Sequence, residues 1–401
     1  MTELFQQTIK RIGGFPGRGL LLLLLAGCTD PYLPEVIKSP PSYLVVDGFL
    51  NSQGITTIKL TRTYAIGSTA AAPPVEAKAT AYLEEENGPR TLLREAPAGT
   101  YSSPALTLNP TKRYRLYLNT LASKQYASDF VPVKNTPPID ALGWRPDNFG
   151  LTINVSAHDA TNATRYYRWD YNETWEIVPP YYANIEYVNH MMRYIAVPNP
   201  RICWGNLQSS VVQVAKTTEF SQDVVSEHAL RKLAISSERL NRRYSILVQQ
   251  HALTKEEYDY WELLRKNTEA IGGLFDSQPV QLTGNVHCLS NAAETALGFV
   301  SAHSMTEKRL FIARNELPNT WTAVSGYESC VPPDTVDLFP KNIFKPPTPA
   351  EIMETAFGNP RYVPIASFEG TLTGATGFYA KSRDCVDCRT RGSGVKPSYW
   401  P

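Results

Sequence analysis

Short apolar runs separated by turn-forming residues fill the first part of this chain and limit what it can fold into. Breaks such as Asn51 to Gly54 and Glu86-Asn87-Gly88 have the composition of hairpin turns. Six runs within about 90 residues have the spacing of strands in an immunoglobulin-type sandwich. These runs are Tyr43 to Leu50, Ile55 to Thr63, Ala77 to Leu83, Thr91 to Arg94, Arg113 to Leu118 and Gln125 to Phe130. We therefore predict a mainly β fold whose first domain, residues 43–134, is an immunoglobulin-like β-sandwich.

A proline-rich stretch ends that domain, because consecutive prolines such as Pro137-Pro138 disfavour both helix and central strand. Beyond it, Tyr167, Trp169 and Tyr171 alternate with polar residues, as on one face of a strand. Residues 139–401 are predicted to form a second, fibronectin-like β domain with helical insertions and a C-terminal region held by disulfides. The less regular stretch from Glu176 to Asn241 is interpreted as a long insertion, partly helical around Val224 to Leu233.

The clearest local pattern is a strand from Tyr244 to Gln249 followed by a helix. Thr254 and Glu257 have the spacing of a capping box, in which each side chain satisfies a backbone N–H at the start of the helix. Tyr258, Trp261 and Leu264 follow at three-residue intervals on one side, so we expect this stripe to pack the helix on a sheet. Gly272-Gly273 is expected to stop the helix.

The first 28 residues have the pattern of an export signal. Lys10, Arg11 and Arg18 precede six leucines, and Leu25-Ala26-Gly27-Cys28 matches a lipobox. The apolar run is much shorter than the roughly 20 residues that a membrane-spanning helix needs. We predict that residues 1–27 are a removed signal peptide, that Cys28 is lipidated, and that residues 28–42 form a proline-containing tether.

Five further cysteines remain in a chain that is expected to be exported: Cys203, Cys288, Cys330, Cys385 and Cys388. In that setting disulfides are expected rather than metal ligands, and an odd number leaves one thiol free. Cys330 is predicted to pair with Cys385 or Cys388, and the other of these two to pair with Cys288 or Cys203. A zinc site would need a second cysteine pair or two spaced histidines, and the sequence after Cys388 lacks the helix of a thioredoxin-like redox motif.

Charge and motifs argue against several functions. The formal charge is only +1 and the leader alone contributes +2, so the mature chain has a charge of about −1 and the basic patch that nucleic acid requires is not expected. The sequence contains no nucleophile elbow, zinc-protease motif, phosphate loop or dinucleotide fingerprint. His190-Met191-Met192 has soft ligands for copper but is a single isolated cluster. We expect no enzyme activity, no metal and no cofactor.

Several stretches together resemble a group of Bacteroidota lipoproteins known as a domain-of-unknown-function family, DUF4249. The resemblance rests on the lipobox, Tyr43 to Gly48, Tyr244 to Gln249 with Tyr258-Asp259-Tyr260-Trp261, Gly284-Asn285-Val286-His287-Cys288, Leu297-Gly298-Phe299, Cys385-Val386-Asp387-Cys388-Arg389, and Lys396-Pro397-Ser398-Tyr399-Trp400. Gly392-Ser393-Gly394 departs from the adjacent glycine pair expected there. Members are typically encoded beside TonB-dependent outer-membrane transporters, so the resemblance implies an accessory lipoprotein with no catalytic residues to carry over.

The sequence therefore predicts a lipid-anchored outer-membrane protein that works with a TonB-dependent transporter in substrate capture or complex assembly. Two other classes stay open: a surface hydrolase acting on glycan or peptide, and a structural adhesion or envelope module. The hydrolase would need convergent acids or a nucleophile and base in a cleft. Within the predicted insertion, the expected contact residues for the partner are Tyr181, Tyr182, Tyr187 and Trp204.

Overall fold

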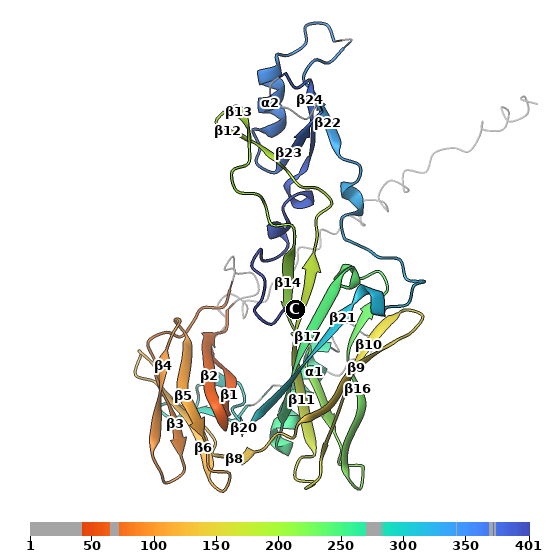
Figure 1. Cartoon of the computed structure of the whole chain (residues 1–401). Coiled ribbons are helices and arrows are strands. Elements are labelled where there is room, and N and C mark those ends of the chain that lie inside the picture. The colour runs from red at the N-terminus through yellow and green to blue at the C-terminus, as the bar shows by residue number, and fades with distance from the viewer. Residues whose placement is uncertain are drawn as a thin grey trace, which may run out of the picture. The chain divides into compact units, whose positions relative to one another are not determined.

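A computed structural model describes residues 42–64, 72–269, 282, 284–341, 343–368, 372 and 374–401 (Figure 1). Within these ranges the chain is mainly β, as predicted from the sequence. The predicted signal peptide, the lipobox with Cys28, nearly all of the tether and the expected helix stop at Gly272-Gly273 lie outside the described residues. No helix in the described ranges is long and apolar enough to cross a membrane.

The first strands close into an eight-stranded barrel. Around the ring the order is β6, β3, β4, β5, β2, β1, β20 and β8, and β8 pairs again with β6. Along β6, Tyr114, Leu116 and Leu118 point into a filled apolar core, and the intervening side chains point outward. Seven of the ring strands come from the first part of the chain: β1 (Leu44–Asn51), β2 (Gln53–Arg62), β3 (Thr80–Glu85), β4 (Arg90–Glu95), β5 (Thr100–Thr107), β6 (Arg113–Asn119) and β8 (Val131–Lys134). Strand β7 (Gln125–Ser128) lies outside the ring and pairs with β6.

This closure differs from the predicted immunoglobulin-like sandwich, and its cause lies far along the chain. β20 (Ala302–His303) enters between β1 and β8 and pairs in parallel with both. A sandwich would leave these two strands as sheet edges, whereas the ring has no edge there. β18 (Val286–Cys288) and β19 (Ala296–Leu297) extend the same sheet by pairing with β7 and β1. Gly298, which has a φ of +123°, allows this close approach, because a Cβ there would lie 2.1 Å from the Val46 carbonyl oxygen.

Two antiparallel sheets built from residues 139–313 share a second apolar core. Tyr167, Trp169 and Tyr171 are buried in it on one face of β11, as their alternation predicts. One sheet contains β9 (Ile139–Pro146), β10 (Gly150–Asp159) and β16 (Asp223–Ala234). The other contains β11 (Tyr166–Ile177), β14 (Cys203–Gln208), β15 (Gln213–Lys216), β17 (Arg243–Ala252) and β21 (Met305–Ala313).

The predicted helix around Val224 to Leu233 is wrong, because these residues lie in strand β16. Val225, Leu230 and Leu233 face the core, and two register shifts in the pairing of β10 with β16 break the strict alternation that would have revealed a strand. The stretch from Glu176 to Asn241 is also not one separate insertion. It contributes β14, β15 and β16 to the two-sheet core.

The predicted helix after Thr254 is α1 (Lys255–Glu269). Thr254 Oγ1 accepts a 3.2 Å hydrogen bond from the Glu257 backbone N–H, which is half of the expected capping box. The other half is absent, because Glu257 Oε1 accepts hydrogen bonds from Ser301 and Trp261. The aromatic stripe faces β11: Tyr258 packs on Tyr166, and Arg168 lies over the ring of Trp261.

A third, smaller part, which we call the hairpin lobe, joins two distant segments around its own core. Hairpin β12 (Ile185–Val188) and β13 (Met191–Tyr194) packs with β22 (Asp334–Asp337), α2 (Pro349–Phe357), β23 (Tyr362–Ser367) and β24 (Gly377–Ser382). Disulfides Cys330–Cys385 and Cys203–Cys388 close its base. Short 3-10 helices complete the described chain: η3 (Glu238–Leu240), η4 (Arg314–Glu316), η5 (Glu328–Cys330), η6 (Arg383–Cys385) and η7 (Cys388–Thr390).

Candidate binding pocket in the hairpin lobe

The tip of hairpin β12–β13 is a two-residue turn that Asn189 and His190 make. Val188 pairs with Met191, and both turn residues have positive φ, 53° and 62°. Two left-handed residues in a two-residue loop form a type I′ turn, whose twist matches that of the flanking strands. Asparagine is among the residues that favour this geometry. The turn positions the His190 ring toward helix α2.

Two side chains of the hairpin contact the carboxylate of Glu354 on α2. Its Oε2 lies 2.8 Å from Nδ1 of His190 and accepts a 2.9 Å hydrogen bond from the Tyr187 hydroxyl. The interaction with His190, followed by that with Tyr187, holds the pKa of Glu354 below its usual value. This carboxylate is therefore ionised at neutral pH and serves as an acceptor rather than as a proton donor.

Two more carboxylates of the same pocket are also paired. Glu186 accepts a 2.8 Å hydrogen bond from Arg193 within the hairpin. Asp387 accepts two from Arg389, at 2.8 and 2.7 Å, and this hydrogen bonding lowers the pKa of Asp387. Arg389 also donates to the Asn199 side chain at 2.7 Å. The polar groups here form fixed donor and acceptor pairs around an open cavity.

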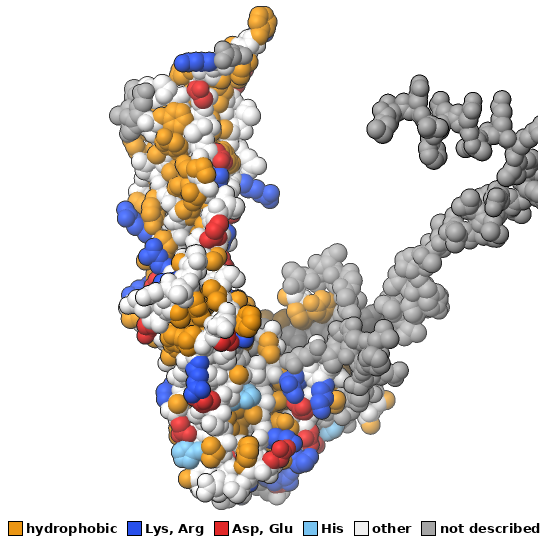
Figure 2. All heavy atoms as spheres, turned by 90° about the vertical axis from the view of Figure 1, so that its right-hand side faces the viewer, with side chains coloured by type: hydrophobic (Ala, Val, Ile, Leu, Met, Phe, Trp, Pro, Cys, Tyr) orange, Lys and Arg blue, Asp and Glu red, His pale blue; other side chains and the backbone are white. Residues whose placement is uncertain are grey.

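The cavity between the hairpin, α2, β23 and the turn around Asp387 has a volume of about 500 Å³, which is within the range of small-ligand sites. Phe357 and Tyr362 stack with centroids 6.1 Å apart in its apolar wall. Strand β13 and the segment after it also expose large apolar side chains: Met191 is 65% exposed, Tyr194 56% and Val197 82%. Figure 2 shows hydrophobic side chains gathered on another side of this lobe, the one that lies to the right in Figure 1.

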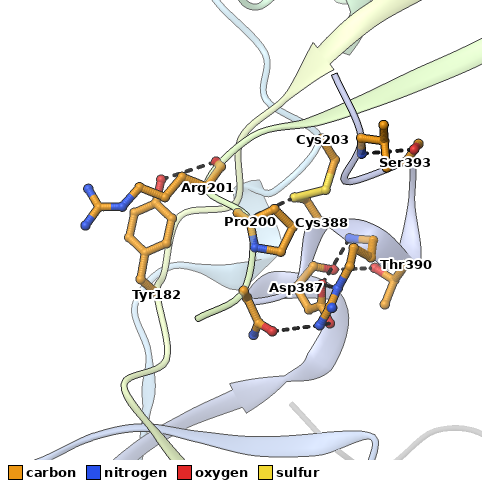
Figure 3. The surroundings of a disulfide bond; sticks show 11 residues. Tyr182, Pro200, Arg201, Cys203, Asp387, Cys388, Thr390 and Ser393 are labelled. Carbon is orange, nitrogen blue, oxygen red and sulfur yellow. Dashed lines mark hydrogen bonds and ion pairs between the residues drawn. A yellow bond between two sulfur atoms is a disulfide. The ribbon is translucent and has the colours of Figure 1, made fainter. Parts of the chain in front are cut away.

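A disulfide fixes the base of the pocket (Figure 3). Cys203 of β14 is bonded to Cys388, one residue after Asp387, and both cysteines are fully buried. Cys330 pairs with Cys385, one of the two partners expected for it, and Cys288 is the free thiol among the described cysteines. The backbones of Trp204 and Ser393 exchange two 2.9 Å hydrogen bonds beside the first disulfide. These links hold the C-terminal turn against β14.

The four aromatic residues expected to contact a partner lie in different surroundings. Tyr187 lines the pocket and binds Glu354. Tyr182 is 42% exposed, donates to the Arg201 carbonyl and lies under the Arg201 guanidinium (Figure 3). Tyr181 instead packs against the two-sheet core, and Trp204 lies next to the buried disulfide. The structure brings only Tyr187 of the four to the pocket, and the helix residue Glu354 had no sequence signal.

A second group of titratable and charged residues lies where the barrel strand β20 meets α1, β11 and β17, and we call it the junction cluster. It consists of Glu257, His303, His251, Asp170 and Arg168. Glu257 and both histidines are almost fully buried. Arg168 donates a 2.9 Å hydrogen bond to Asp170, whose Oδ2 lies 3.2 Å from Nε2 of His251. His303 Nε2 lies 4.0 Å from Glu257, and the Phe49 ring stacks on His303.

Burial sets the protonation states of this cluster. It raises the pKa of Glu257 to about 7 and lowers the pKa of both His251 and His303. Burial alone would also raise the pKa of Asp170, but Arg168 and His251 hold it at about 2. Among the described residues no group of three or more His, Cys, Asp or Glu side chains is arranged to hold a metal ion. The cluster lines no pocket described above, so we assign it to the contact between barrel and sheets.

Comparison with known proteins identifies a family and no more. The model of a family described as a domain of unknown function, DUF4249, matches residues 29–309. No curated protein matches the chain. The matched residues include the barrel, hairpin β12–β13 and the two sheets as far as the middle of β21, and they end before β22, α2, β23 and β24.

Proposed function

Since this chain belongs to the DUF4249 family, we propose that it is a lipid-anchored accessory protein of a TonB-dependent outer-membrane transporter, working in substrate capture or complex assembly. The lipobox at Cys28 supports the anchor, and the family resemblance described above supports the transporter as partner. A tether confines both proteins to one thin layer, so a modest contact between them is sufficient. In this proposal the hairpin lobe is the contacting part.

The observation that carries the binding role is the pairing of every carboxylate in the hairpin pocket. Glu354, Glu186 and Asp387 each have a cationic or hydrogen-bonding partner among the described residues. A general acid at neutral pH needs a raised pKa, whereas the pKa values of Glu354 and Asp387 are lowered. Fixed ion pairs beside apolar walls favour recognition of a ligand or partner over proton transfer. We therefore propose a non-enzymatic role.

The contacting surface in this proposal consists of exposed apolar side chains of β13 and the segment after it, Met191, Tyr194 and Val197, together with Tyr182 and Tyr187. Exposed apolar side chains that flank a pocket are typical of binding surfaces. Tyr181 and Trp204 are left out, because their surroundings are internal. Deleting residues 176–241 would not test the surface, because it would remove three strands of the two-sheet core.

The test is affinity capture from detergent-extracted native membranes. The combined variant Met191→Ser, Tyr194→Ser and Val197→Ser should recover the transporter at least about tenfold less well than the natural chain, since central apolar anchors dominate binding energies. The control is Leu121→Ser, which changes an equally exposed side chain (71%) in the β6–β7 turn of the barrel. The control should recover as much transporter as the natural chain.

Two outcomes would contradict the proposal. One is capture that yields the lipoprotein alone under conditions that preserve other envelope complexes. The other is equal recovery by the hairpin variant and the control, with both melting at the natural temperature. The anchor is tested separately, because Cys28→Ala should release the chain from the membrane fraction or leave an uncleaved precursor.

We also make a proposal about the fold of the two-sheet core. We infer a fibronectin-like sandwich for residues 139–313, since a three-stranded sheet and a sheet around β11 enclose one apolar core. An experimental structure in which these sheets pack face to face at about 10 Å would support this inference. Strands that continue from one sheet into the other would contradict it.

A further inference from the structure

The connection between β22 and α2 presents an unusual group of side chains, which we call the apolar tip: Phe339, Ile343 and Phe344, with Lys341 and Lys345. Phe344 is fully exposed, Phe339 is 59% exposed and Ile343 52%. Both lysines are also exposed. In Figure 2, hydrophobic side chains lie next to basic ones at the end of the hairpin lobe, where Figure 1 places this connection. Three large apolar side chains so close together on a surface require an explanation.

The apolar tip is held at both ends, so the exposure belongs to a built loop. Before it, Leu338 is buried in the lobe core and its N–H donates to the Thr376 carbonyl at 3.0 Å. After it, Thr348 caps α2: its hydroxyl accepts from the Glu351 N–H, and the Glu351 carboxylate accepts from the Thr348 N–H at 2.8 Å. Pro346 and Pro347 restrict the backbone between these anchors. The lobe thus holds the apolar side chains outward.

The charge of this segment has one sign only. Between Asp337 and Glu351 the sequence contains two lysines and no acidic residue. Apolar side chains flanked by lysine are the composition of segments that lie at a membrane interface. Protein interfaces, by contrast, are depleted in lysine. A lipid surface also needs no shape-matched pocket, which suits a ring as exposed as Phe344.

We propose that the apolar tip is a second membrane contact, which inserts Phe339, Ile343 and Phe344 among lipid headgroups while Lys341 and Lys345 pair with anionic lipid. The contact would act beside the lipid at Cys28, which as a lipobox cysteine would carry a diacylglyceryl group and already anchor the chain. It would also fix the orientation of the hairpin lobe at the bilayer. The inference does not depend on the transporter, since a pure lipid surface contains none.

The test uses the chain from residue 28 onward with Cys28→Ala, so that neither the leader nor the lipid anchor masks a weaker contact. The probe is sedimentation with vesicles of phosphatidylglycerol and phosphatidylcholine in equal amounts. Phe339→Ser, Ile343→Ser and Phe344→Ser together should lower the vesicle-bound fraction about tenfold. Lys341→Gln with Lys345→Gln should lower it by a similar factor at low salt and less at high salt.

Phe149→Ser is the matched control, because Phe149 is 75% exposed and also lies beside a lysine, Lys232, but far from the tip in sequence. It should sediment like the parent chain. Phe344→Trp adds a direct readout, since its fluorescence should shift to shorter wavelength only when anionic vesicles are present. A parent chain that stays in the supernatant would overturn the proposal. So would a triple variant that still sediments, or one that loses only transporter recovery, because the tip would then be a protein contact.

Discussion

The barrel and the hairpin lobe are stabilised by different interactions. Among the described residues the barrel core has twenty buried apolar side chains, whereas the lobe core has six. The barrel holds the free, buried Cys288, and the lobe is closed by two disulfides. Small cores rarely stabilise a fold alone, and covalent links commonly compensate. We infer that apolar burial stabilises the barrel and that the lobe relies on its disulfides.

The sharpest way to test this contrast is to remove the disulfide that encloses most of the lobe. Cys330–Cys385 spans 55 residues, which include β22, α2, β23 and β24. Cys330→Ser with Cys385→Ser should destabilise the lobe by about 4 kcal/mol in the chain-entropy model. Hydrogen exchange should accelerate in β22 to β24 and stay unchanged in β1 to β6.

Cys288→Ser is the control for this prediction, since it changes a buried cysteine that forms no disulfide. It should leave exchange in the lobe unchanged. Equal acceleration in lobe and barrel after the double substitution would show that the two parts unfold as one unit, and the contrast would fail.

The corresponding test for the barrel removes part of a buried apolar side chain and so creates a cavity. Leu116 is fully buried on β6, and Leu116→Ala should destabilise the barrel by about 3 kcal/mol through lost burial and an unfilled cavity. Denaturant unfolding followed by hydrogen exchange should show the loss in β1 to β6, with the lobe protected as before. Leu121→Ala, at an exposed site, should change stability by less than about 0.5 kcal/mol.

The sequence predicted those features that neighbouring residues determine. Tyr167, Trp169 and Tyr171 alternate along a single strand, so their burial on one face was foreseeable. The same holds for the start of α1, because Thr254 acts on a residue three positions away. One longer-range feature was also predicted in part: Cys330 was expected to pair with Cys385 or Cys388, and it is bonded to Cys385.

Features that depend on distant pairing could not be predicted in this way. The barrel closes only because Ala302 and His303 pair with β1 and β8, more than 160 residues earlier in the chain. The pocket likewise needs His190 and Glu354, which are 164 residues apart, to meet. Neither pairing produces a pattern among neighbouring residues of the sequence from which it could be predicted. The junction cluster shows the same limit, since Glu257 fits a capping box by spacing but binds Ser301 of the barrel connection.

The smallest expected effect is a pH dependence of stability that comes from the junction cluster. This cluster joins the barrel to α1 and the sheets, and the lobe does not contain it. Burial raises the pKa of Glu257 to about 7, above the usual value of 4.5. Its stabilising contribution is therefore complete below about pH 4.5, is lost progressively as the pH rises from 4.5 to 7, and does not change further above 7. His251 and His303 have lowered pKa values, so their contribution is present above about pH 6.5 and is lost below it.

Between pH 5 and 7, the stability difference between a Glu257 variant and the natural chain isolates this carboxyl group, because both chains contain both histidines. Glu257→Gln removes the ionisation and keeps an acceptor for Ser301 and Trp261. The variant should gain stability over the natural chain by about 1.4 kcal/mol for each pH unit in this range, and the difference should stay constant above about pH 7. Glu262→Gln on the same helix is the control: Glu262 is paired with Arg265, and although burial alone would raise its pKa, that pairing lowers it. Its effect should therefore stay constant over this range. Denaturant midpoints at each pH give both curves, and a Glu257→Gln difference that does not change with pH would mean that the carboxylate is not desolvated at the junction.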